Sequence, residues 1–509
     1  MFSTPTFDEL NVWVTLPVIS LALGTCIMLL VDVLLPKNRK VITAWLAAIG
    51  VGVSLVLSFF QASDLISIGE DGTAFEGLFV ADQFTYVVNI IVLLATLIGI
   101  MVAYEYLKRT GMERGEFYAL MLFSAVGAML MGATRNLVLI FIALELLSIP
   151  LYVLSGFRRP KEESEESAMK YFLLGAFASG FLVYGIAFIY GATGSFEITE
   201  IWTSAVDILN GDAPGEFTLL IGVGLIIIAL GFKVGAVPFH MWQPDVYQGA
   251  PTPVTAFMSV AAKAGGFAAM LRVLATGSSI VTDADLINIW QDTVQIIALA
   301  TLVLGNFVAL MQTDLKRLLA YSSIAHGGYI LIAVAAGGSD GVGDMAAQAG
   351  LIYLLAYTFT NIGAFAVVAA LERDDATGTS IDDVKGLALR NPGLAAMMTI
   401  FMFSLTGVPL TAGFMGKWFV FRAALEGELY WLAVAGILTS VVSAYYYLRV
   451  VVNMYMIAPD EGAAPQRIQP VLRSALVLTA AGTLVFGILP YLLSDITKDV
   501  TLAIIGFIL

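Results

Sequence analysis

Long apolar stretches separated by short polar connectors make up nearly the whole sequence. A helix that spans a membrane needs about 20 mostly apolar residues, and about 14 stretches meet that length. They predict an all-α polytopic membrane protein in which residues 1–509 form a single membrane domain. The predicted spans lie near residues 11–35, 41–61, 83–107, 116–133, 136–157, 168–192, 217–237, 254–275, 286–311, 316–336, 345–371, 394–421, 430–457 and 470–492. Between spans, segment 197–210 alternates acidic and apolar residues, which predicts a surface helix.

Two predicted spans are interrupted by glycine and proline. The seventh reads Gly-Phe-Lys-Val-Gly-Ala-Val-Pro at 231–238, and the twelfth contains Leu-Thr-Gly-Val-Pro at 405–409. Breaks at corresponding places in two halves are typical of inverted-repeat transporters. We therefore expect helices 7 and 12 to be discontinuous within two inverted five-helix repeats, spans 4–8 (116–275) and spans 9–13 (286–457). Ordinary proline kinks are the alternative.

The composition agrees with a membrane protein and limits its chemistry. Hydrophobic residues make up 59% of the chain and charged residues 13%, and the mean hydropathy is +0.89. A soluble domain would need more polar surface. Cys26 is the only cysteine, which excludes an internal disulfide and an iron–sulfur cluster built by this chain alone. With only two histidines, His240 and His326, a haem or zinc site is not expected either, so we predict no cofactor and no metal in this chain.

The basic residues predict the orientation in the membrane. If the N-terminus faces outward, 18 of the Lys and Arg residues fall on the cytoplasmic side and four on the other side, with three inside spans. The positive-inside rule expects such a bias. We therefore predict that both termini lie on the non-cytoplasmic side.

Three lysines lie within apolar spans: Lys233, Lys263 and Lys417. An intramembrane ammonium is costly, so its default interpretation is a place on an ion or proton pathway. Lysine suits proton transfer because its ammonium can give up its proton when buried, whereas a guanidinium stays charged.

Glu145 lies in the fifth span, and Lys233 is its natural partner. Desolvation raises the proton affinity of a carboxyl and lowers that of an amine, and pairing the two groups opposes both changes. Moving the partner would therefore load or release a proton. A static ion pair that fixes helix register is the alternative.

His326, in Tyr-Ser-Ser-Ile-Ala-His at 321–326, could pass a proton between sites near neutral pH. It could equally be a core histidine with satisfied hydrogen bonds, and His240 could cap a helix end. Tyr445, Tyr446 and Tyr447 are interpreted as packing or interface aromatics.

Three segments resemble the antiporter-like subunits of proton-pumping NADH:quinone oxidoreductase, respiratory complex I, and in particular the N-type subunit. They are 231–257, 314–326 and 407–418, and the resemblance runs from about residue 80 to 460. The lysine at 417 is similar to the N-type pattern, whereas M-type subunits tend to carry glutamate there.

The resemblance implies a translocase subunit without a redox centre of its own, in the cell inner (plasma) membrane. It would couple quinone reduction elsewhere to outward proton transfer, with Glu145 and Lys233 as modulating pair, Lys263 and His326 as central relay and Lys417 as terminal site. NADH, FMN, iron–sulfur clusters and quinone would belong to partner subunits. Expected neighbours are M-type and small K-type subunits and the lateral helix of the L-type subunit, with no nucleic acid.

Two rival functions remain open at this stage. The related subunits of multisubunit sodium/proton antiporters use an ion gradient instead of electron transfer, and these residues do not determine the ion. A non-transporting membrane scaffold with fixed charges is the second rival.

Overall fold

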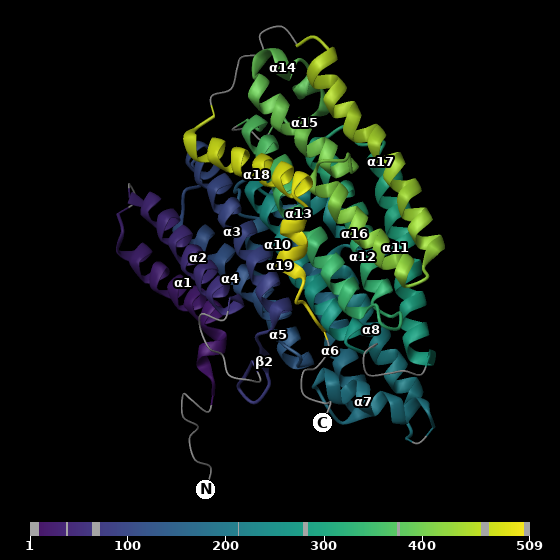
Figure 1. Cartoon of the computed structure of the whole chain (residues 1–509). Coiled ribbons are helices and arrows are strands. Elements are labelled where there is room, and N and C mark those ends of the chain that lie inside the picture. Colours follow the sequence, from purple (N-terminus) through teal and green to yellow (C-terminus); the bar gives the residue numbers. More distant parts are fainter. Residues whose placement is uncertain are drawn as a thin grey trace.

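The computed structural model describes residues 10–36, 39–63, 72–211, 213–277, 284–373, 377–459 and 468–502, and for 284–289 the backbone only. Long helices run side by side across the body (Figure 1). The first half holds α1 (Leu16–Leu34), α2 (Val41–Ala62), α3 (Gln83–Arg109), α4 (Gly115–Gly132), α5 (Leu137–Ser155), α6 (Glu162–Thr193), α7 (Ile198–Leu209), α8 (Glu216–Val234), α9 (Trp242–Gly249) and α10 (Thr252–Met270).

The second half holds α11 (Ala284–Ala309), α12 (Leu315–Ala336), α13 (Gly343–Leu371), α14 (Leu387–Arg390), α15 (Pro392–Thr406), α16 (Ala412–Glu426), α17 (Tyr430–Met456), α18 (Pro470–Ile488) and α19 (Tyr491–Thr497). Short elements complete the described chain: the 3-10 helices η1 (Val12–Thr15) and η5 (Ile381–Val384), the π-helix η3 (Leu271–Ala275), and the hairpin β1 (Thr73–Ala74) and β2 (Phe79–Val80).

The structure confirms the all-helical membrane fold. Among the described residues, 13 helices are long and apolar enough to cross a membrane. The twelfth predicted span, 394–421, is divided between α15 and α16, each of 15 residues, so neither half reaches spanning length alone. The expected surface helix at 197–210 is α7.

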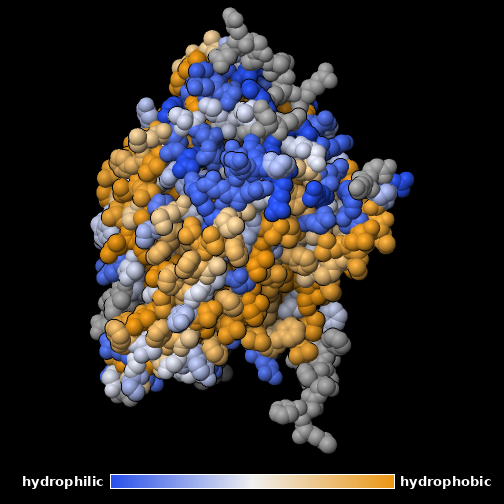
Figure 2. All heavy atoms as spheres, turned by 180° about the vertical axis from the view of Figure 1, so that it is seen from behind, coloured by the Kyte–Doolittle hydropathy of each residue, from blue (hydrophilic) through white to orange (hydrophobic). Residues whose placement is uncertain are grey.

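The outside of the molecule carries a broad apolar belt with a hydrophilic cap at one end (Figure 2). In Figure 2 this cap lies at the top, which is the end where Figure 1 shows α14, and we call it the α14 end. An apolar belt of this kind is the surface that faces lipid. Helices can form it because their backbone groups are already hydrogen-bonded within each helix and need no water. Of the basic residues predicted for the cytoplasmic side, Lys37 and Arg467 lie outside the described residues.

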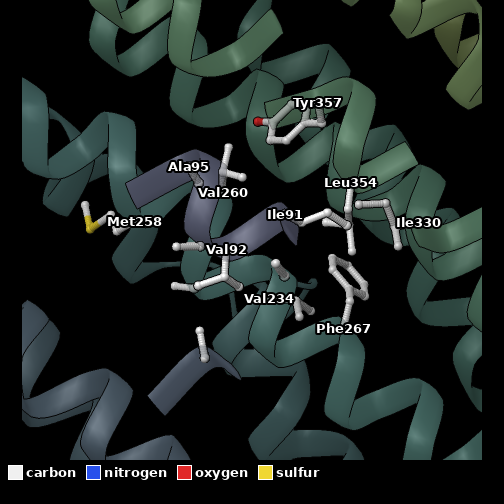
Figure 3. Close-up of a cluster of buried hydrophobic side chains, with 14 of the residues drawn as sticks. Ile91, Val92, Ala95, Val234, Met258, Val260, Phe267, Ile330, Leu354 and Tyr357 are labelled. Atoms are coloured by element: carbon white, nitrogen blue, oxygen red, sulfur yellow. The ribbon is translucent and has the colours of Figure 1, made fainter. Parts of the chain in front are cut away.

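The interior is built around α10, α12 and α13. The hydrophobic windows of these helices are 100%, 94% and 100% buried, whereas those of α1, α2 and α6 are below 40%. Helix α3 and the end of α8 also contribute to the central cluster shown in Figure 3, so α10 is enclosed by protein on every side. The labelled members of this cluster are Ile91, Val92, Ala95, Val234, Met258, Val260, Phe267, Ile330, Leu354 and Tyr357.

Both interrupted spans end their first helix in the same way. After α8, Gly235 has φ +76° and the Ala236 amide donates to the Gly231 carbonyl at 2.8 Å; after α15, Gly407 has φ +92° and the Val408 amide donates to the Phe403 carbonyl at 3.0 Å. This is a Schellman motif, in which a left-handed glycine lets the last carbonyls find donors. The breaks at helices 7 and 12 are therefore confirmed and share one local geometry.

A buried ion pair fastens the other end of the helices, opposite α14. Arg272 in η3 is fully buried, and its two terminal nitrogens donate to the two carboxylate oxygens of Asp82 at 2.6 Å each. The same guanidinium donates to the Gly132 carbonyl at 3.1 Å and to Thr85 Oγ1 at 3.0 Å. Asp82 also caps α3 by accepting from the Thr85 amide. One arginine therefore ties together the ends of α3, α4 and α10.

We predict that alanine at either break glycine destabilises the protein. A left-handed backbone costs a residue with a side chain about 1–2 kcal/mol, and a Cβ on Gly407 would lie 3.1 Å from Lys417 Cδ. Gly235→Ala and Gly407→Ala should lower the temperature at which this subunit is released from the detergent-solubilised complex. Gly224→Ala in α8 is the control, because a Cβ added there would have no neighbouring atom within 4 Å and the backbone is helical. Equal release temperatures for all three variants would contradict this account.

We also predict that the Asp82–Arg272 pair makes stability depend on acid pH. Burial alone would raise the pKa of Asp82, but the charge and hydrogen bonds of Arg272 outweigh burial and lower it. A lowered pKa means that stabilisation is complete above the unfolded value, near 4, and disappears as the pH falls through the folded value. Asp82→Asn should destabilise by about 3–5 kcal/mol at neutral pH, since it leaves Arg272 buried without its counter-charge.

The measurement is thermal unfolding of the purified complex between neutral and acid pH. Wild type should lose stability on acidification relative to Asp82→Asn, so the two curves should converge at the acid end. Parallel curves would show that this pair does not carry the pH dependence.

Candidate functional site

Lys233, in the last turn of α8, is held by neutral hydroxyl groups. Its Nζ donates to Ser148 Oγ of α5 at 2.7 Å and to the Tyr171 hydroxyl of α6 at 3.3 Å. The Tyr171 ring, 5.5 Å from the ammonium, is stacked on Trp242 of α9. The lysine is 3% exposed, so its charge is enclosed by α5, α6, α8 and α9.

Glu145 lies one helical turn before Ser148 on α5, and its carboxylate accepts a hydrogen bond from Ser179 of α6. Among the ion pairs of the described residues, none joins Glu145 to Lys233. The structure therefore places the two predicted partners close along α5 but not in direct contact. Lys233 donates instead to Ser148, one turn further along α5.

Lys263 lies in the middle of α10 and is 2% exposed. Its Nζ donates to the main-chain carbonyl of Ser323 on α12. The glycine opposite leaves room for this contact, since a Cβ on Gly327 would lie 3.3 Å from the Lys263 Nζ. The Val234 carbonyl, next to Lys233, would lie 3.4 Å from that same Cβ, so α8, α10 and α12 meet here.

His326 on α12 is 3% exposed and is hydrogen-bonded through both ring nitrogens. Nδ1 lies 2.6 Å from the hydroxyl of Tyr353 on α13, and Nε2 lies 3.1 Å from the hydroxyl of Tyr447 on α17. Tyr447 also shares a 2.5 Å hydrogen bond with Ser322 Oγ.

The interpretation of Tyr447 as a packing aromatic was therefore incomplete, and Tyr353 was missed. A signal was present, since a tyrosine deep in an apolar span needs a partner for its hydroxyl. The sequence could not say which of the buried tyrosines faces the histidine.

Lys417 follows the second break and turns back onto the helix before it. Its Nζ donates to the main-chain carbonyls of Leu405 at 3.1 Å and Thr406 at 2.8 Å, and to Ser440 Oγ of α17 at 2.8 Å. The ammonium also lies 4.8 Å from the centre of the Tyr329 ring. A cation at the carbonyl end of a helix is favoured by the helix dipole, so Lys417 caps α15.

The predicted site residues form a series on neighbouring helices. Helix α5, with Glu145, packs on α6 and α10; α8 packs on α10, α10 on α12, and α12 on α16. The residues in this order are Glu145, Lys233, Lys263, His326 and Lys417. The structure brings them into one continuous interior, although no hydrogen bond joins one of them directly to the next among the described residues.

A charged cavity of about 280 Å³ opens at the α14 end. Glu372, 2% exposed, accepts from the Tyr106 hydroxyl at 3.0 Å and from Arg158 at 2.8 Å, and Thr252 also donates to it. Burial would raise the pKa of Glu372, but the charge of Lys316 and these hydrogen bonds lower it. The sequence reasoning did not single out Glu372, because it follows directly on a long span and resembles an ordinary helix-end acid.

His240 lies in the turn between α8 and α9 and is partly buried. Burial lowers the pKa of His240, and its Nδ1 has no hydrogen-bond partner among the described residues. The Nδ1 atom of His240 therefore does not cap a helix end, which was the alternative proposed from the sequence.

Comparison with known proteins defines the class. The family described as "NADH:quinone oxidoreductase/Mrp antiporter, TM" matches residues 134–443. NADH-quinone oxidoreductase subunit N from Trichlorobacter lovleyi is 43% identical over 97% of both chains, and subunit N 1 from Herpetosiphon aurantiacus is 44% identical over 95% of both. The chain belongs to this family of antiporter-like membrane proteins. Within it, the chain belongs to the subunit N family of NADH-quinone oxidoreductase, complex I.

Solved structures agree with this assignment. A chain of respiratory complex I from Thermus thermophilus with bound Aureothin is 34% identical, with a TM-score of 0.76 and coverage of 96% of this chain and 99% of that one. A chain of the Mrp complex from Dietzia sp. DQ12-45-1b has a TM-score of 0.80 at 19% identity, over 96% of each chain, so it shows the shared fold alone.

Proposed function

We propose that this subunit moves protons outward across the membrane through Glu145, Lys233, Lys263, His326 and Lys417, driven by quinone reduction elsewhere in the assembly. One observation carries the proposal. Three lysines are enclosed in an apolar body, and among the described ion pairs none of them has a carboxylate partner. A buried ammonium without a counter-charge is costly, so each lysine can release a proton and take one up as its surroundings change.

Each residue has a distinct role in this mechanism. Glu145 and Lys233 form the modulating pair: bringing them together stabilises both charges, and separating them favours proton release. Lys263 and His326 form the central relay between the two broken spans, and Lys417 is the terminal site. The carbonyls and hydroxyls that hold the lysines support these roles. They accept hydrogen bonds from an ammonium but, being neutral, leave it able to release its proton.

The two halves would act as inverted repeats over 116–275 and 286–457. The shared Schellman break supports this arrangement, as does the reversed direction in which α4 and α11 begin their five spans. Both termini would lie on the non-cytoplasmic side of the cell inner membrane, with the α14 end in the cytoplasm.

The energy must come from other subunits. Outward transfer of one proton costs about 2.3 kcal/mol per 100 mV, and a pKa change of one unit corresponds to about 1.4 kcal/mol. Bringing together or separating the two charges of one buried ion pair changes the free energy by about this amount. NADH, FMN, iron–sulfur clusters and quinone would be bound by partner subunits, while M-type and small K-type subunits and the L-type lateral helix would contact this chain.

The experiment is to replace each lysine in the assembled complex and compare the proton gradient with NADH oxidation in proteoliposomes. Lys233→Ala, Lys263→Ala and Lys417→Ala should reduce the gradient formed per NADH. Lys233→Arg should reduce it too, because a guanidinium keeps the charge but does not release its proton. Lys108→Ala is the control, since Lys108 is an exposed lysine at the end of α3.

The outcome separates the rival functions. A full proton gradient with Lys233→Ala in a correctly assembled complex would favour the scaffold. A gradient that depends on sodium and forms without NADH oxidation would favour the sodium/proton antiporter.

A further inference from the structure

The central relay has a gap between Lys263 and Lys417, and His326 alone does not bridge it. Lys263 is bound to the Ser323 carbonyl, whereas Lys417 is bound to the end of α15. The imidazole donates to or accepts from neither ammonium. Other groups must therefore carry a proton between the histidine and each lysine.

Three hydroxyl groups continue the hydrogen bonding on both sides of the imidazole. Ser322 Oγ lies 2.5 Å from the Tyr447 hydroxyl, which lies 3.1 Å from Nε2; Nδ1 lies 2.6 Å from the Tyr353 hydroxyl. The four side chains come from α12, α13 and α17, and all are at most 3% exposed. We call this series, Ser322–Tyr447–His326–Tyr353, the hydroxyl–imidazole chain.

The two ends of the hydroxyl–imidazole chain lie beside the two lysines. Ser322 precedes Ser323, whose carbonyl holds Lys263. At the other end, the Tyr353 ring packs against Gly416, where an added Cβ would lie 3.1 Å from the ring. Gly416 directly precedes Lys417, and Tyr353 is also stacked with Tyr329, whose ring faces the Lys417 ammonium. The chain therefore covers the middle of the gap between the lysines and leaves one step at each end.

We propose that Tyr447 and Tyr353 are proton-carrying residues of this subunit, which pass the proton into one nitrogen of His326 and out of the other. This inference rests on the proposed function. A hydroxyl is both donor and acceptor, and a neutral imidazole has one of each. Every member of the hydroxyl–imidazole chain can thus accept a proton on one side and donate one on the other without becoming an ion.

The transfer balances atom by atom. Lys263 loses an N–H proton to Ser322 Oγ, Ser322 gives its own proton to Tyr447, and Tyr447 gives its own to Nε2. The proton on Nδ1 then moves to Tyr353, whose own proton goes to the neutral amine of Lys417. Five bonds to hydrogen break and five form. Lys263 ends as an amine, Lys417 as an ammonium, and the imidazole in its other tautomer.

The two end steps cross distances without a direct hydrogen bond, so each needs a water molecule or a side-chain movement. A small cavity next to His326 and Tyr353 supports the first option at the Lys417 end. It measures about 10 Å³, is also lined by Thr360 and Ser404, and reaches Gly413 and Gly416 on α16. That is about enough room for one water molecule.

The neighbouring tyrosine provides a matched control. Tyr446 is adjacent to Tyr447 on α17 and is equally buried, but its hydroxyl donates to Asn306 Oδ1 at 3.0 Å. Tyr446→Phe removes a buried hydroxyl with a hydrogen bond, as Tyr447→Phe does; Tyr446 also contacts Tyr447, but the substitution keeps all four side chains of the hydroxyl–imidazole chain.

The experiment uses the whole complex in proteoliposomes and measures the proton gradient per NADH oxidised, in H₂O and in D₂O. Tyr447→Phe and Tyr353→Phe should reduce the gradient to the level of His326→Ala and leave a slow residual rate, whereas Tyr446→Phe should match the wild type. The H₂O/D₂O ratio of pumping rates should rise in Tyr447→Phe, because proton transfer becomes slower relative to other steps. A merely structural loss would not change that ratio.

The outcomes distinguish this inference from the function on which it rests. If His326→Ala still forms a full gradient, the central relay of the proposed function fails. If His326→Ala loses the gradient while Tyr447→Phe behaves like Tyr446→Phe in both readouts, the proposed function stands and this inference is overturned. If Tyr447→Phe does not assemble, Ser322→Ala and Tyr353→Phe decide by the same two readouts.

Discussion

The structure depends on the way in which ammonium groups are kept inside an apolar body. Each of Lys233, Lys263 and Lys417 is met by hydroxyls or main-chain carbonyls and, within the described parts of the chain, by no carboxylate. Neutral acceptors lower the cost of burying the charge only in part. A nearby carboxylate would stabilise the ammonium so strongly that the lysine would keep its proton. In contrast, Arg272 and Asp82 form a complete, paired site at the end opposite α14. Paired charges fasten the helices there, and unpaired ones line the interior.

The helix breaks create the acceptors that the lysines use. An intact helix offers few free carbonyls at membrane depth, because each one is bonded to an amide one turn further along. Ending α15 at a left-handed glycine frees the carbonyls of Leu405 and Thr406 for Lys417. The same motif ends α8 directly after Lys233, although there the ammonium binds to side-chain hydroxyls. Backbone irregularity and buried charge therefore occur together for a physical reason.

The sequence was sufficient for much of this architecture. Apolar length predicted the spans, Gly and Pro predicted both breaks, and the cost of intramembrane charge drew attention to the three lysines. The partners of these residues could not be predicted. Whether Glu145 touches Lys233 depends on the rotation of α5 and α8, and in the structure Lys233 donates to Ser148 instead. The tyrosines beside His326 come from α13 and α17, and only packing decides which aromatic rings face inward.

The position of Lys417 joins proton occupancy to mechanics. As an ammonium it donates to Leu405, Thr406 and Ser440 together, so one side chain connects the end of α15, the start of α16 and the middle of α17. A neutral amine has one hydrogen fewer and no charge to attract the helix end. Loss of the proton would therefore weaken the junction between α15 and α16, and by reciprocity opening this junction would lower the affinity of Lys417 for its proton. Under the proposed function, Lys417 would both carry the proton and hold the junction between α15 and α16.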